Sequence, residues 1–139
     1  MATRFVVVLG VFVVSGLLAH AQQKPAVKIG PIPQTSPVNA KEMFDTYCAT
    51  CHGVTGKGDG PAALALKKAP ADLTRISARN GGKFPGVQVE RYIRGVDEFP
   101  AHGNRDMPIW GNLFKTIGSD QSAQLRVRNL VDYLESIQQ

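Results

Sequence analysis

The sequence predicts an all-α domain, and three segments carry that prediction. Apolar residues recur every three or four positions in 39–53 and in 119–137, which is the period of a helix that buries one face. A shorter segment, 87–94, shows part of the same pattern and precedes a glycine that can end a helix. No stretch of useful length has the alternation of a strand. The expected fold therefore contains three or more helices.

The first 21 residues are typical of a secretory signal peptide. Arg4 precedes an uncharged apolar run, and Ala19-His20-Ala21 forms a small-x-small cleavage site. The run has about 14 residues, whereas a membrane-spanning helix needs roughly 20, so a permanent anchor is the weaker interpretation. Cleavage would leave 118 residues, enough for one small domain exported to the periplasm or another extracytoplasmic compartment. Membrane association is expected only if the segment is retained.

A proline-rich segment, residues 22–38, follows the signal-like segment and precedes the domain at 39–139. Its four prolines lie among polar residues without a helical or strand period: Pro25, Pro31, Pro33 and Pro37. This composition favours an extended, solvated linker. We expect no contribution to the core before about Ala40.

The first expected helix begins after Asn39, which can cap it, with Glu42 three residues later as in a capping box. Its apolar face comprises Met43, Phe44, Tyr47, Cys48 and Cys51. Gly53 is a suitable stop. The helix should therefore run into the sequence CATCHG.

Both cysteines of the chain, Cys48 and Cys51, lie in that motif, and His52 follows directly. Residues i and i+3 share a face of a helical turn, so all three side chains can address one flat ligand. A zinc site would need a fourth ligand, for which His102 is a candidate. A thioredoxin-type dithiol would follow a strand, and a structural disulfide would leave the histidine unexplained. Covalent haem attachment uses both thiols and the imidazole, which binds the iron.

An electron-transfer haem needs a second axial ligand. Met107, in the sequence RDMPIWG, lies far along the chain from His52 and can supply a thioether from a loop. Met43 lies too close to Cys48 and is better explained as a core residue. His102 is the competing ligand.

The chain from about residue 40 to residue 136 resembles the class I, monohaem cytochromes c, and in particular a bacterial subset. The resemblance rests on Phe44 four positions before the first haem cysteine, on CxxCHG, on the Met-Pro pair at 107–108 and on a final helix with Leu-x-x-Tyr. It implies a cytochrome c-like fold in which the first and last helices cross around one covalently attached haem c. It also implies that His52 and Met107 are the axial ligands of the iron.

The same resemblance suggests a role for Pro61, and two other residues, Trp110 and Arg75, are candidates for contact with the haem. The carbonyl of Pro61 would accept a hydrogen bond from the imidazole of His52 and fix its orientation. Trp110, the single tryptophan, would pack against the haem or donate its indole N–H to a propionate, with an ordinary core role as the alternative. Arg75 is a candidate partner for a propionate.

The last expected helix has Ser119 as its N-cap. Its apolar stripe comprises Val127, Leu130, Val131, Leu134 and Ile137. Charged residues occupy its other faces: Arg126, Arg128, Asp132 and Glu135. By the crossing that the resemblance implies, Leu130 and Tyr133 would meet the face of the first helix that carries Phe44.

The charge distribution bears on the partners. Without residues 1–21 the chain has 15 basic and 11 acidic residues, a net charge of +4, and residues 57–94 alone carry +5. An exported protein without aromatic stacking motifs is a poor candidate for binding nucleic acid. A basic surface near the haem would steer docking onto an acidic redox donor or acceptor, while a merely solvated surface is the alternative.

These observations favour an extracytoplasmic electron carrier that is not an enzyme and needs no small-molecule substrate. One alternative is a haem subunit of a larger dehydrogenase or oxidase complex. Another is a haem enzyme or ligand sensor in which Met107 leaves the distal position open. No acid/base pair suited to peroxide chemistry is evident, which disfavours the last.

Overall fold

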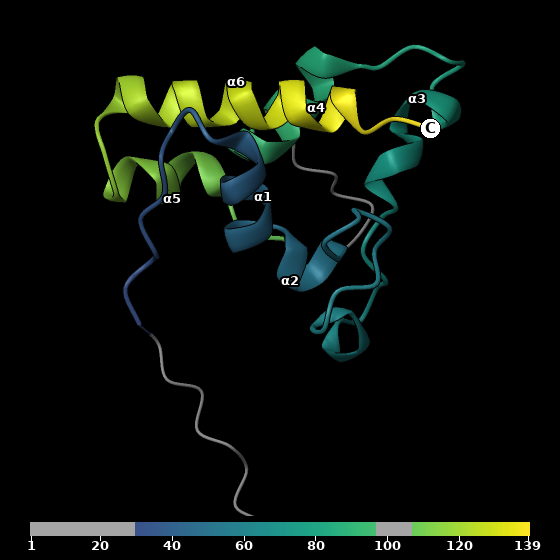
Figure 1. The fold of residues 1–139 in the computed structure, drawn as a ribbon, viewed down its shortest axis with the longest axis horizontal. Helices are drawn as coiled ribbons and strands as arrows, with labels where there is room; N and C mark the ends of the chain where they lie inside the picture. Colours follow the sequence, from purple (N-terminus) through teal and green to yellow (C-terminus); the bar gives the residue numbers. More distant parts are fainter. Residues whose placement is uncertain (1–29, 97–106) are drawn as a thin grey trace, which may run out of the picture. The chain divides into compact units, whose positions relative to one another are not determined.

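The computed structural model describes residues 30–96 and 107–139, so the predicted signal peptide and His102 lie outside the described residues. The described chain contains α1 (Ala40–Tyr47), α2 (Ala49–His52), α3 (Ile76–Arg79), α4 (Gly86–Arg94), α5 (Trp110–Thr116) and α6 (Asp120–Ser136), with 3-10 turns η1 (Ala63–Ala65) and η2 (Leu73–Arg75) (Figure 1). Within those residues there is no strand, which confirms the all-α prediction. None of the described helices is both long and apolar enough to cross a membrane.

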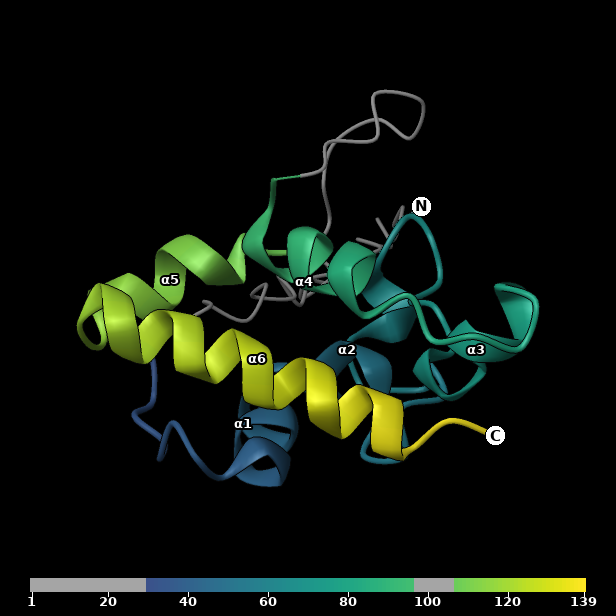
Figure 2. The ribbon, with the colours of Figure 1, turned by 90° about the horizontal axis from the view of Figure 1, so that it is seen from above.

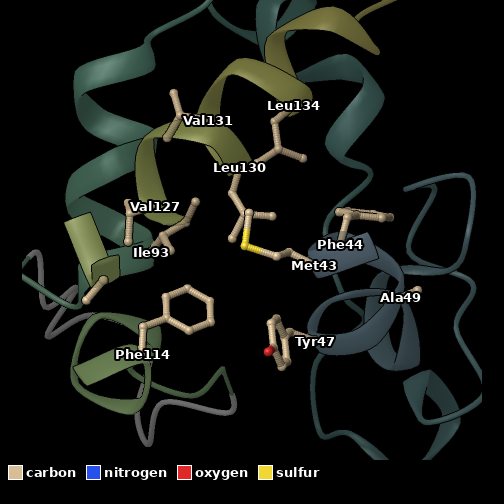
Figure 3. Packing of buried hydrophobic residues seen from close by; sticks show 11 residues of the cluster. Met43, Phe44, Tyr47, Ala49, Ile93, Phe114, Val127, Leu130, Val131 and Leu134 are labelled. Carbon is tan, nitrogen blue, oxygen red and sulfur yellow. The ribbon is translucent and has the colours of Figure 1, made fainter. Parts of the chain in front are cut away.

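The domain is organised around α6, the longest helix, which packs against α1, α4 and α5 (Figures 1 and 2). The buried apolar side chains are Met43, Phe44, Tyr47, Ala49, Ile93, Phe114, Ala123, Val127, Leu130, Val131 and Leu134 (Figure 3). Phe44 is fully buried, and its ring centroid lies 5.2 Å from that of Tyr133 on α6. The predicted crossing of the first and last helices is thereby confirmed.

The helix ends follow the sequence signals closely. The Asn39 side chain accepts a hydrogen bond of 3.1 Å from the backbone N–H of Glu42, and Ser119 caps α6 by accepting one of 3.2 Å from Ser122 N–H. Gly95 ends α4 in the left-handed conformation, with φ of 75°. The sequence pattern did not predict α5, because its seven residues are too few to show a period and include a glycine at the second position.

The prediction that the chain before Ala40 adds nothing to the core is wrong for residues 31–39. Ile32 packs against the core, and the Tyr47 hydroxyl donates a hydrogen bond of 2.7 Å to the Pro33 carbonyl. The Asn129 side chain of α6 donates one of 2.8 Å to the carbonyl of Pro37. Residues 31–39 therefore form a strap across α1 and α6, and its backbone carbonyls accept hydrogen bonds from side chains of both helices.

Arg126 lies outside the apolar stripe of the last helix, as the sequence indicates, yet the structure buries it. Its side chain is 3% exposed. Its two terminal nitrogens donate hydrogen bonds of 2.8 and 2.6 Å to the side-chain and backbone oxygens of Thr35 in the strap. A charge at a helix position beside the apolar stripe is solvated only if no other segment covers that face, and here the strap covers it.

Replacing Phe44 with alanine should reduce the free energy of unfolding by about 3–5 kcal/mol, because it removes a fully buried ring at the crossing of α1 and α6. Urea titration of the haem-loaded protein measures this loss. The control Val87→Ala, at a side chain 76% exposed, should stay within about 0.5 kcal/mol of the parent. Equal losses in both variants would contradict the placement of the core.

Candidate functional site

The CATCH motif forms a short helical turn that continues from α1 after a break. The chain leaves α1 at Cys48, whose N–H bonds to the Phe44 carbonyl at 2.9 Å, and resumes as α2. The N–H of His52 returns to the Cys48 carbonyl at 2.9 Å. Gly53 ends the turn with φ of 76°, a conformation that favours glycine. The prediction of a helix that runs into the motif and stops at Gly53 is confirmed, apart from the break.

The two thiols are free and half-buried, and no disulfide joins them. Burial, with a smaller effect of the neighbouring Cys51, raises the pKa of the Cys48 thiol to about 12, so this group is protonated at neutral pH. Across residues 30–96 and 107–139, no three His, Cys, Asp or Glu side chains are placed to hold one metal ion. Cys48, Cys51 and His52 therefore do not converge on a single ion as a zinc site requires.

The imidazole of His52 is held by a backbone carbonyl from a distant part of the chain. Its Nδ1 lies 3.0 Å from the carbonyl oxygen of Ala71. Because a carbonyl can only accept, Nδ1 carries the proton and the lone pair of Nε2 is left free to bind a metal. Burial lowers the pKa of His52, and the bond to Ala71 opposes that effect, so the neutral ligand form is favoured.

The predicted hydrogen bond from His52 to Pro61 is therefore corrected: the acceptor is Ala71. Pro61 is exposed and lies between two residues that bond back to the motif. Gly60 N–H bonds to the Cys51 carbonyl at 3.1 Å, and Ala62 N–H bonds to the Thr50 carbonyl at 2.9 Å. These bonds hold the Pro61 turn beside the carbonyl end of α2.

A second set of backbone hydrogen bonds positions Ala71 beside the imidazole. The N–H of Gly58 bonds to the His52 carbonyl at 2.8 Å, and the N–H of Leu73 bonds to the Gly56 carbonyl at 2.7 Å. The following turn is fixed by Asp72, whose carboxylate accepts hydrogen bonds of 2.9 and 2.6 Å from the backbone and hydroxyl of Thr74. These bonds from Thr74 lower the pKa of Asp72, so the carboxylate that holds the turn stays ionised.

Met107 and Trp110 follow the residues 97–106 that lie outside the described chain: Met107 precedes α5, and Trp110 is its first residue. Met107 is half-buried and packs against the core. The Trp110 ring lies 5.4 Å from that of Tyr47 and 5.7 Å from that of Phe114. The aromatic cluster of Tyr47, Trp110 and Phe114 thus joins α5 to the residue that directly precedes Cys48, and the core role left open for Trp110 fits this packing.

Arg75 ends η2 and is exposed. No hydrogen bond or ion pair of the described chain brings it to the CATCH turn. The sequence contains no indication of Ala71, because every residue has a backbone carbonyl and residue type does not show which one accepts the hydrogen bond. The only usable signal was the Asp-x-Thr turn at 72–74, which indicates a fixed loop but not its target.

The free thiol pair, the imidazole with one nitrogen held by a carbonyl, and the all-α fold define a class of protein, those that bind haem through a CxxCH turn. A family model for cytochrome c matches residues 37–138, and the chain belongs to the cytochrome c family. The family binds covalently attached haem c with its iron, and the residues present fit that group. Searches of curated proteins and of solved structures found no match.

Replacing Gly60 with alanine should disturb the CATCH turn directly. A side-chain carbon there would lie 2.5 Å from the carbonyl oxygens of both Ala49 and Thr50, so the loop must move away from α2. We expect a lower yield of haem-loaded protein, measured as haem absorbance per mole of polypeptide.

Gly81→Ala is the matched control, because its φ of 66° strains alanine but no atom lies within 4 Å of the added carbon. It should cost about 1–2 kcal/mol of stability and leave haem loading normal. Normal loading in Gly60→Ala would show that contact between this loop and the turn is not required.

Proposed function

We propose that this chain is an extracytoplasmic electron carrier of the class I, monohaem type found in bacteria. Membership of the cytochrome c family establishes haem-based electron transfer in general terms. The observation that carries the finer proposal is the CATCH turn, in which two free thiols accompany an imidazole whose Nδ1 is already held by Ala71. The chain has one such motif and two cysteines, which supports a single haem.

Each residue of the proposed site has a defined task. The Cys48 and Cys51 thiols would hold the haem through thioether bonds, each formed by addition of an S–H across a vinyl group. Nε2 of His52 would bind the iron, and the hydrogen bond to Ala71 would set the orientation of the imidazole. Met107, from the segment before α5, would supply the second ligand. When bound, the haem supplies a one-electron couple between ferric and ferrous iron, and the thioether ligand favours the ferrous state.

The proposed partners are redox proteins with acidic docking surfaces. All basic side chains of residues 57–94 except Arg94 are exposed, namely Lys57, Lys67, Lys68, Arg75, Arg79, Lys83 and Arg91. Exposed like charges on one stretch of chain raise the rate of encounter with an oppositely charged surface. Export rests on the signal-like residues 1–21 and on the general export of the family.

The mass of the denatured protein tests attachment and export together. It should equal that of residues 22–139 plus one haem, because thioether formation loses no atoms and the bonds survive acid-organic extraction. The variant with serine at both Cys48 and Cys51 should release its haem under the same treatment. Recovery of free haem from the parent, or retention of residues 1–21, would contradict the proposal.

Met107→Ala should remove the iron–thioether charge-transfer band, lower the potential and allow the ferrous form to bind carbon monoxide. Absorption spectra and a redox titration measure these effects. His102→Ala should leave all three properties unchanged. The opposite pattern would identify His102 as the ligand and make the protein a bis-histidine cytochrome.

Replacing Lys67 and Lys68 with glutamate should lower the rate of electron transfer to an acidic redox protein at low ionic strength. The difference should vanish near 1 M salt, where the Debye length is about 3 Å. The control replaces Lys41 and Lys115, two exposed lysines outside residues 57–94 that pair with Asp45 and Asp120, and changes the net charge equally. Stopped-flow kinetics measure the electron-transfer rate as a function of salt. A rate that does not depend on salt would favour a permanent subunit of a larger complex over a diffusing carrier.

A further inference from the structure

Arg126 is the one charged side chain among the buried residues of the described chain. Its hydrogen bonds go to two neutral oxygens of Thr35, and its Nε is buried without a partner. Within residues 30–96 and 107–139, no carboxylate forms an ion pair with it. Among the described residues, this enclosed positive charge therefore has no matching negative charge.

The contacts of this charge lead, through one further residue on each side, toward the segments that carry Cys48 and Met107. Thr35, which accepts the bond from Arg126, lies 2.9 Å from the hydroxyl of Tyr47, and Tyr47 directly precedes Cys48 in the chain. The guanidinium carbon also lies 5.9 Å above the ring centre of Phe114 on α5, the helix that follows Met107. Arg126 thus contacts Thr35 and Phe114, and both of these residues contact Tyr47, the residue before Cys48.

A contribution to folding stability does not explain why the guanidinium of Arg126 is buried. Taking a guanidinium out of water is costly, and neutral oxygens and an aromatic face compensate for only part of the cost. Replacing buried charges with apolar residues of similar size is often neutral or stabilising. The strap makes the burial tolerable, since both acceptors of the terminal nitrogens belong to Thr35.

An enclosed charge has a long reach. Coulomb interactions weaken much less through the protein interior than through water, and salt screens buried charges poorly. Ferric haem carries one more positive charge than ferrous haem. A buried cation without a counter-ion in the same domain would therefore destabilise the ferric state relative to the ferrous state.

We propose that the buried, unpaired charge of Arg126 raises the reduction potential of the haem, so that this residue of α6 and the strap that encloses it set the working potential of the carrier. The inference rests on the proposed function, because it requires a haem attached at Cys48 and Cys51. The electron gained by the iron comes from the redox donor, and Arg126 changes neither its protonation nor its bonds in the process.

The test is a spectroelectrochemical titration of the haem-loaded protein and four variants. Arg126→Gln and Arg126→Met remove the charge, and the midpoint potential should shift downward in both. Arg126→Lys keeps the charge but loses the two-pronged bond to Thr35, and should retain most of the parent potential. Arg128→Met removes an exposed charge two residues further along α6 and should shift the potential much less.

Glutamine can still donate to Thr35, so it provides a neutral variant if the methionine variant does not fold. Retention of the parent haem spectrum in each variant shows that the axial ligands are unchanged. Equal shifts in Arg126→Lys and Arg126→Gln, or in Arg126→Gln and Arg128→Met, would overturn the inference. Absence of a covalent haem signal from every protein would instead refute the proposed function.

Discussion

The hydrogen bond from His52 Nδ1 to the carbonyl of Ala71 is the interaction on which the proposed site depends. It determines which nitrogen of the imidazole carries a proton and therefore which one can bind iron. It spans 19 residues, so it exists only if the intervening loop has one conformation. That conformation is set by backbone bonds from Gly58, Gly60 and Ala62 to the CATCH turn and from Leu73 to Gly56. The loop is thus a support for the ligand and not a mere connection.

The strap and the aromatic cluster form the second determinant of the site. Tyr47 donates to Pro33 and packs against both Trp110 and Phe114, so the residue before Cys48 is fixed from two directions. Arg126 holds the same strap from α6. A segment that sequence composition describes as a linker therefore becomes part of the wall around the helix that carries the thiols. Because the strap keeps water away from Arg126, the proposed effect of this charge on the haem is weakly screened.

Much of the fold could be predicted from the sequence because its signals are local. The Asn39 and Ser119 caps, the glycine at position 95 and the apolar stripe of α6 are all set by residues within a few positions of each other. The meeting of Phe44 with Tyr133 came from family resemblance and is confirmed by their ring contact. The cysteines and the histidine of the motif could be identified because their chemistry requires those residue types at that spacing.

The remainder could not be predicted because it depends on distant backbone groups. The acceptor for His52 is a carbonyl, which every residue possesses, so Pro61 and Ala71 could not be told apart by residue type. The burial of Arg126 depends on Thr35, which lies 91 residues away and in a segment without regular structure. A pattern on one helix shows which face is apolar, but it does not show which other segment will cover the neighbouring face.

The central claim, that Ala71 holds the proximal imidazole, is tested most directly by NMR of the ferrous haem-loaded protein. The account predicts a His52 Nδ1–H proton that exchanges slowly with solvent and shows nuclear Overhauser contacts to Ala71 or Asp72. A rapidly exchanging Nδ1–H, or contacts from this proton to Pro61 instead, would contradict it.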